Sequence, residues 1–179
     1  MSFPLSFVPS KNWRVPPRSF GAPRNQGKRK HAGCDLYAPP GTPVFAVDDG
    51  TVLSFAPFYL GSWAIVVKRP GFVVRYGEVR KTLASGVKVG GAVRKGQKIG
   101  EVSALTGLSI SMVHFEMYTG EKEGPLTTQS GPFKRRGDLK DPTRILEKWA
   151  EGPLPVLPRE VEAEPVAAAA PRPASVKGR

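Results

Sequence analysis

Short runs of apolar residues separated by turn-forming pairs are the main pattern along the chain. Runs rich in Val, Ile, Phe and Tyr occupy residues 44–47, 51–55, 63–68, 72–76, 87–89, 98–103 and 112–118. Pairs such as Asp-Gly, Pro-Gly and Gly-Gly stand between them. Short apolar runs bounded by turn residues are typical of β-strands. The pattern therefore predicts a mostly β domain built of antiparallel strands.

Two of the turns predict β-hairpins. Asp-Asp-Gly at residues 48–50 separates the first two runs, and Pro-Gly at residues 70–71 separates the third and fourth. Gly accepts the positive φ angle that a tight turn needs, and Pro presets the dihedral angle before it. We expect the runs on either side of each turn to pair with each other.

One short helix is predicted near the end of the domain. Asp141 can cap it, Pro142 suits its first position, and Gly152 ends it. Leu146 and Trp149 belong to an apolar stripe at helical spacing between these residues. The helix is expected to pack its stripe on the sheet.

Composition narrows the class of protein. The 19 Pro and 20 Gly residues interrupt the chain too often for a helical bundle, and no apolar run approaches the roughly 20 residues of a membrane span. The single Cys34 excludes an intramolecular disulfide and is expected in the core. We divide the chain into a basic, Pro-rich N-terminal arm (1–20), a domain (21–150) and a Pro/Ala-rich flexible tail (151–179).

The formal net charge of +12 favours a polyanionic partner. Residues 1–30 carry seven basic side chains and no acidic one, but Trp13 and Phe20 are the only aromatics interleaved with them. No nucleic-acid-binding motif is present, so nucleic acid is disfavoured and attraction to an acidic cell wall accounts for the same charges. The basic cluster at 134–136 is expected to be a solvated loop, with a role at the border of a groove for an acidic substrate as the alternative.

The two histidines of the chain, His31 and His114, are the main candidates for chemistry. His31 and Asp35 would lie about 13 Å apart in an extended strand, so they can share an ion only if the backbone turns between them. Gly33 permits such a turn. Taken alone the pair is weak evidence, because a surface His near an Asp is common.

Strand alternation places His114 and Glu116, with Met112, on one face of the strand and Val113 and Phe115 on the other, apolar face. Two histidine nitrogens and one carboxylate oxygen are a usual ligand set of catalytic zinc. At this point the pattern favours the alternative, an ordinary, hydrogen-bonded, half-buried histidine at position 114.

An ordered series of motifs resembles the lysostaphin-like (LytM-type) M23 metallopeptidases over roughly residues 20–146. In chain order the motifs are HAGCDLYAPPGTPVFAVDDGTV, RYGEV, VKVGGAVRKGQKIGEV, MVHFEMY and DPTRIL. The resemblance implies a β-sheet domain of the duplicated hybrid motif type. It also implies a Zn²⁺ ion held by His31, Asp35 and His114, and hydrolysis of the peptide cross-bridges of bacterial peptidoglycan.

The sequence departs from the family pattern at two positions. Met112 stands in place of the first histidine of H-x-H, and Glu78 in place of the histidine of Y-x-H-L. Because other zinc peptidases use a carboxylate as general base, our hypothesis is that Glu78 takes this role. We place Met112, Glu116 and Tyr76 around the ligands or in the pocket. The alternative is a catalytically inactive M23-like domain that serves as a structural or cell-wall-binding component.

The expected route to the cell wall is indirect. Residues 1–17 have neither the charged start nor the apolar stretch of a secretory signal peptide. We therefore expect a phage particle or a similar injection device, with subunits that the Pro-rich segments contact, to carry the domain; release by lysis is the other route.

Overall fold

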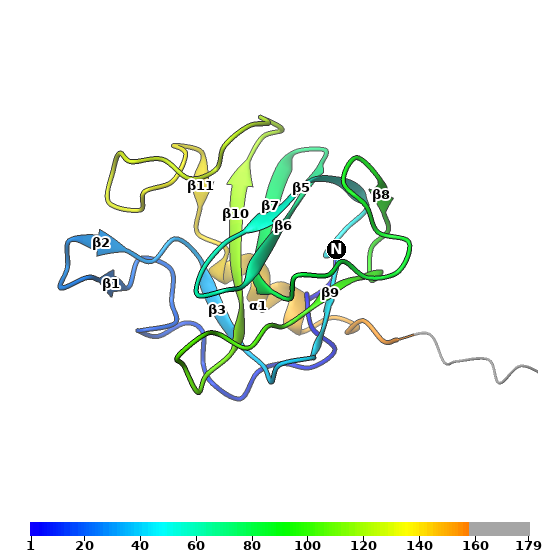
Figure 1. Cartoon of the computed structure of the whole chain (residues 1–179), viewed down its shortest axis with the longest axis horizontal. Helices are drawn as coiled ribbons and strands as arrows, with labels where there is room; N and C mark the ends of the chain where they lie inside the picture. The colour runs from blue at the N-terminus through cyan, green and yellow to red at the C-terminus, as the bar shows by residue number, and fades with distance from the viewer. Residues whose placement is uncertain (158–179) are drawn as a thin grey trace, which may run out of the picture.

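The structure, a computed structural model that describes residues 1–157, consists mainly of antiparallel β-strands, as predicted (Figure 1). Within residues 1–157 a single helix, α1 (Thr143–Ala150), follows the last strand. The strands are β1 (Pro23–Arg24), β2 (Arg29–Lys30), β3 (Cys34–Tyr37), β4 (Pro43–Phe45), β5 (Gly50–Pro57), β6 (Trp63–Arg69), β7 (Phe72–Val79), β8 (Ala92–Val93), β9 (Lys98–Glu101), β10 (Met112–Thr119) and β11 (Leu139–Lys140).

Strand β10 organises the main sheet. The sheet has the order β11-β10-β7-β6-β5-β8, and β3 also pairs with β10. β3 pairs with residues 112–115 of β10 and β11 with residues 117–118, so these two short strands follow one another along the edge of β10 that faces away from β7. β1 with β2 and β4 with β9 form two separate small sheets.

One predicted hairpin is confirmed and the other is wrong. β6 and β7 form a hairpin around Pro-Gly at 70–71, with Gly71 at a φ of +91°. β4, in contrast, pairs with β9, while β5 pairs with β6 and β8. Asp-Asp-Gly at 48–50 therefore leads the chain from one sheet to another, because a turn motif sets local direction but not the partner strand. The predicted strand at 87–89 is also absent, and β8 lies a few residues later.

The core lies between the main sheet and the elements that cover one of its faces. Phe115 of β10 packs edge to face against Trp149 of α1, with ring centroids 6.1 Å apart. Cys34 points into the same core, as expected. Pro142, and not Asp141, occupies the N-cap position of α1, one residue later than predicted; Asp141 precedes it and accepts a hydrogen bond from the Thr143 N–H at 2.8 Å.

The first twenty residues do not form a free arm, which corrects the predicted organisation. Phe3, Leu5 and Trp13 are fully buried in the main core. The segment also adds backbone hydrogen bonds, including one from Ser2 N–H to the Val47 carbonyl at 2.8 Å. Most of the predicted tail, 158–179, lies outside the described residues. No helix in residues 1–157 is long and apolar enough to cross a membrane.

Candidate metal centre

Two of the three predicted ligands are direct neighbours across the sheet. His114 of β10 pairs with Asp35 of β3 on one side and with Gly77 of β7 on the other. Cross-strand partners hold their side chains about 5 Å apart on the same face. This face is opposite the core that contains Val113 and Phe115, as the alternation predicted.

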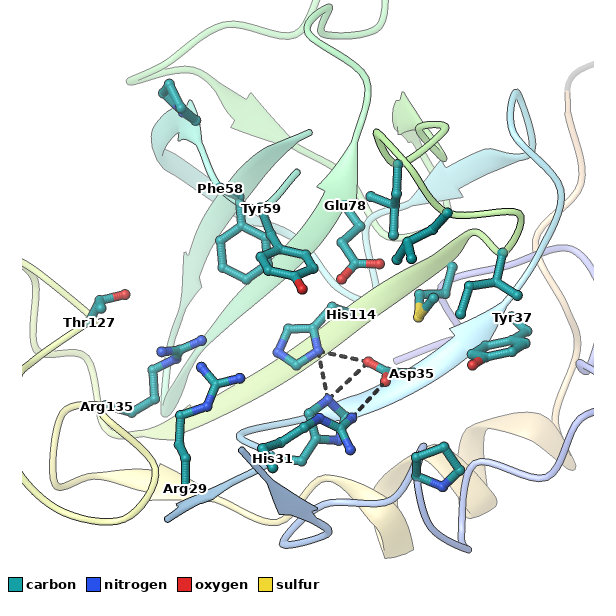
Figure 2. Close-up of a pocket in the computed structure, with 17 residues that line it drawn as sticks. Arg29, His31, Asp35, Tyr37, Phe58, Tyr59, Glu78, His114, Thr127 and Arg135 are labelled. Carbon is teal, nitrogen blue, oxygen red and sulfur yellow. Dashed lines mark hydrogen bonds and ion pairs between the residues drawn. The ribbon is translucent and has the colours of Figure 1, made fainter. Parts of the chain in front are cut away.

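The third predicted ligand, His31, reaches the same place because the chain approaches β10 closely just before β3. A Cβ atom on Gly33 would collide with the carbonyl oxygen of Phe115. His31 Nε2 therefore lies 3.0 Å from Asp35 Oδ1 and 3.0 Å from His114 Nδ1, and His114 Nδ1 lies 2.8 Å from Asp35 Oδ1 (Figure 2). The structure thus brings the three residues together.

The outer nitrogen of each imidazole is already engaged. His31 Nδ1–H donates to the Ser19 carbonyl at 2.9 Å, and His114 Nε2–H donates to Glu116 Oε1 at 2.9 Å. These contacts set the tautomers, so that His31 Nε2 and His114 Nδ1 turn their lone pairs toward Asp35. Metal-ligating histidines are commonly oriented by such a contact at the second nitrogen.

The donor set fits a divalent metal such as Zn²⁺. Two imidazole lone pairs and a carboxylate oxygen this close together require a cation between them. Without a metal, a second proton on His114 supplies the positive charge between these atoms. Burial lowers the pKa of His114, but its hydrogen bonds to Asp35 and Glu116 outweigh the effect of burial and raise the pKa to about 9. Burial likewise opposes ionisation of Asp35, but bonds to His114 and His31 hold its pKa at about 2. Nitrogen and oxygen ligands of this kind are those that zinc takes.

Glu116 is fully buried beneath His114 and has a complete set of partners. It accepts hydrogen bonds from His114 and from Arg135 Nε at 2.8 Å, forms an ion pair with Arg75 at 3.2 Å, and accepts from the Tyr118 hydroxyl. Burial works against its charge, but these partners keep its pKa well below the usual range. Glu116 therefore lies next to the predicted ligand His114, where the alternation in the sequence placed it.

The basic cluster at 134–136 is not a solvated loop, which corrects the first expectation for it. Arg135 is held by Glu116 and lines the pocket, and Arg136 is buried in an ion pair with Asp138 at 2.7 Å. The buried carboxylate of Glu116, on the preceding strand β10, draws Arg135 inward, and no local sequence pattern around Arg135 indicates this contact. The alternative expectation, a position at the border of a groove, describes Arg135 correctly.

A β-bulge directs Glu78 into the same pocket. Ile65 pairs with Tyr76 and Trp63 pairs with Val79, so Ala64 lies opposite two residues of β7 instead of one. Regular alternation would send Glu78 to the core side with Tyr76. Instead Glu78 adopts a φ of +65° and lines the pocket, while Val79 takes the place in the core.

The carboxyl group of Glu78 has little compensation for its burial. It is 6% exposed, and Oε2 has no hydrogen-bond partner among residues 1–157. Burial raises the pKa of Glu78 to about 7, the negative charge of Asp35 adds to this, and His114 and Arg24 oppose it. Figure 2 shows the carboxyl group directed toward the His114–Asp35 side of the pocket.

The pocket around these groups has a volume of about 660 Å³. Met112 lines it, as expected. Tyr76 does not, which corrects its placement: its ring is buried in the core, and its hydroxyl accepts a hydrogen bond from Val47 N–H at 2.9 Å. Besides the groups already described, the lining includes Arg24, Arg29, Tyr37, Phe58, Tyr59, Leu105, Leu108, Ile110 and Thr127.

Sequence reasoning missed several residues that touch the predicted ligands. Ser19 and Arg24 fall in or next to the segment taken as an arm, yet Arg24 Nη2 lies 3.2 Å from Asp35 Oδ2. The ring of Phe58 stacks on His114 with centroids 5.7 Å apart, in space that Gly77 leaves free: a Cβ there would lie 2.6 Å from the Phe58 ring. In the sequence, only Gly77 could have indicated the contact between Phe58 and His114.

Comparison with known proteins agrees with the geometry. The model of peptidase family M23 matches residues 29–125, which is more than half of the chain. The chain belongs to peptidase family M23.

Its relatives include the peptidoglycan DD-endopeptidase ShyB of Vibrio cholerae, which is 33% identical over 122 residues, covering 68% of this chain and 28% of ShyB. This M23 chain spans about a third or less of the length of the curated relatives it matches.

Among solved structures, the catalytic domain of lysostaphin from Staphylococcus simulans shares the fold, with a TM-score of 0.54 and 22% identity over 72% of this chain and 89% of that domain. A zinc-containing peptidase from Vibrio cholerae gives a TM-score of 0.50 and 26% identity over 65% of this chain and 37% of that one.

Proposed function

We propose that this M23 domain is a zinc metalloendopeptidase that hydrolyses peptide cross-links of bacterial peptidoglycan, with Glu78 as its general base. The main support for the proposal is that one pocket contains both a set of converging metal-binding atoms and a buried carboxyl group without a partner in residues 1–157. Three donor atoms, on His31, Asp35 and His114, converge within 3.0 Å with their outer contacts satisfied. Beside them, Glu78 presents a buried carboxyl oxygen without a partner among the described residues.

The surroundings of each residue indicate its proposed role in catalysis. When bound, Zn²⁺ supplies a Lewis acid and lowers the pKa of water. His31 and His114 would hold it with Asp35, in the orientation that Ser19 and Glu116 impose. Glu78 would accept the proton of the attacking water, since a general base works best with a pKa near the operating pH. Met112 has no proton to exchange and shapes the pocket wall.

The relatives support both the metal and the substrate class. ShyB is named as a peptidoglycan DD-endopeptidase, and the similar Vibrio cholerae peptidase contains zinc. Two imidazoles with one carboxylate are also a ligand set that leaves a fourth zinc position for water or substrate. Extension of these activities to this chain is the proposal, because the chain matches only part of each relative.

Release of soluble peptide fragments from purified cell walls tests the proposal. The zinc-loaded wild-type chain should release fragments, and the rate should rise with pH as Glu78 loses its proton. Glu78→Gln should lower the rate by roughly 100- to 10,000-fold without changing the zinc content. Glu151→Gln, the same change at an exposed position after α1, should leave the rate unchanged.

Two results would contradict parts of the proposal. If Glu78→Gln keeps the full rate, Glu78 is not the base. If the zinc-loaded wild-type chain releases nothing, hydrolysis is wrong, and the inactive wall-binding or structural domain is supported. Met112, which stands where the family has a histidine, is the feature that favours this second candidate.

The route of delivery stays a prediction. The expectation of a phage particle or injection device rests on sequence composition, and the packing of residues 1–20 on the core removes one of the segments expected to contact other subunits. Detection of this chain by mass spectrometry in purified particles of its source would support that route. Its absence from such particles would contradict it.

A further inference from the structure

Arg29 is the arginine of the pocket wall whose charge is not already used. Three arginines line the part of the pocket next to the metal ligands. Arg24 is paired with Asp35 at 3.2 Å, and Arg135 with Glu116 at 2.8 Å. Within residues 1–157, Arg29 forms no ion pair and no side-chain hydrogen bond. Its guanidinium is therefore available to a ligand.

The backbone around Arg29 is held in place, so the charge has a defined position. Arg29 pairs with Arg24 across the β1–β2 sheet, and the N–H of the next residue, Lys30, donates to the Pro132 carbonyl at 2.8 Å. Figure 2 shows the guanidinium groups of Arg29 and Arg135 both turned toward the His31–His114 cluster. A positive group that lines the pocket without an acidic partner, as Arg29 does among residues 1–157, favours an anionic group on the ligand.

Another part of the lining consists of large hydrophobic side chains and restricts what kind of anion fits. Tyr59, Leu108 and Ile110 line the same pocket and are 52%, 45% and 42% exposed, although all three are hydrophobic. These side chains come from the loops after β5 and before β10. A ligand that meets both sets of residues must carry an anionic group together with small apolar groups, as a short acidic peptide does.

We infer that Arg29 binds a free carboxylate of the peptide in this pocket, so that the domain selects acidic cross-linked peptides over their amidated forms. The inference rests on the proposed function for the identity of the ligand as a cell-wall peptide. A guanidinium matches a carboxylate with two parallel hydrogen bonds, and an amide cannot accept both. Arg29 is thus a specificity-determining residue.

Binding to a chain that does not cleave its ligand tests the inference. The probes are a soluble cross-linked cell-wall peptide with free carboxylates and the same peptide with those carboxylates converted to amides. The zinc-loaded Glu78→Gln chain should bind the free form roughly 10- to 100-fold more tightly. Adding Arg29→Gln should abolish this preference, and Arg29→Lys should restore part of it.

Lys28→Gln, which removes the same charge from the exposed turn between β1 and β2, is the matched control and should keep the preference. Equal binding of the two peptides by the parent chain overturns the inference. So does an equal loss in Arg29→Gln and Lys28→Gln, which would indicate only long-range attraction. The inference is also overturned if neither peptide binds measurably to the parent Glu78→Gln chain.

The outcomes separate this inference from the proposed function. If cell walls are not hydrolysed but the preference depends on Arg29, the proposed catalysis fails and the inference stands. If hydrolysis proceeds at equal rates on free and amidated peptides, the inference fails and the proposed function stands.

Discussion

Asp35 and Glu78 are two buried carboxyl groups of one pocket with opposite surroundings. They are almost equally buried, at 7% and 6% exposure. Asp35 has His31, His114 and Arg24 around it, and its pKa is held at about 2. Glu78 has no hydrogen-bond partner for Oε2 among the described residues, and its pKa is raised to about 7.

The difference shows that partners, and not depth, decide what a buried carboxyl group can do. A carboxylate that stays charged at every physiological pH can serve as a ligand, whereas one that titrates near neutrality can exchange a proton. The positive φ of Glu78 adds backbone strain to the cost of its burial. A costly, uncompensated position of this kind is typical of functional sites.

The strongest test of the Asp35 side of this comparison is Asp35→Ala. The substitution removes one of the three proposed ligands and leaves Arg24 without its acidic partner. Bound zinc, measured by mass spectrometry of the metal, should be lost at wild-type zinc concentrations. Fragment release should fall by roughly 1,000-fold or more, because a catalytic metal supplies several kcal/mol. Wild-type zinc affinity in Asp35→Ala would show that Asp35 is not a ligand.

Glu116→Gln should give the next largest effect, on metal affinity. A glutamine cannot hold the His114 tautomer as a carboxylate does, so we expect zinc affinity to fall by roughly 10- to 100-fold. Calorimetric zinc titration measures this. Thr127→Ala is the control: Thr127 also contacts Arg75, at 3.3 Å, but does not touch His114. An equal loss in both variants would argue against orientation of His114 by Glu116.

Glu78→Gln should stabilise the metal-free protein at alkaline pH. Because the folded-state pKa of Glu78 lies near 7 and its unfolded value near 4.5, the wild-type chain loses stability as pH rises through this window. The variant should gain roughly 3 kcal/mol in unfolding free energy at pH 8 and almost nothing at pH 4.5.

Urea unfolding of both chains at the two pH values measures this difference. A gain that does not depend on pH would mean that relief of strain or better packing, and not burial of charge, separates the two chains. Asp35→Asn should change stability in the opposite direction, since the partners of Asp35 favour its charged form.

Met112→Leu should have the smallest effect. The side chain is buried at the pocket wall, and Leu has nearly the same volume, so unfolding free energy should change by less than about 1.5 kcal/mol. Fragment release should stay within a few-fold of wild type. A loss of more than tenfold in the rate of fragment release would show that Met112 contributes more than shape. Met112 would then be a third functional group of the pocket, beside Asp35 and Glu78.

Much of the site could be predicted, but mainly from the ordered series of motifs that resembles the M23 metallopeptidases, since the local patterns alone left His31, Asp35 and His114 as weak candidates. The alternation over residues 112–118 separates His114 from Phe115, and the spacing of His31, Gly33 and Asp35 anticipates the turn that joins the pair. The contributions of Ser19 and Arg24 could not be predicted, since nothing in a basic, proline-rich segment indicates that it folds against β3. Arg29 was likewise counted only as part of a cationic segment.

The sequence by itself determined the features that depend on neighbouring residues: the strand periods, the Pro-Gly hairpin, the short helix and the division of β10 into two faces. Tertiary structure alone decided that β4 pairs with β9, that Phe3 and Trp13 complete the core, and that the bulge opposite Ala64 turns Glu78 from the core into the pocket. Backbone pairing across a sheet depends on distant segments, and one extra residue reverses the direction of a side chain.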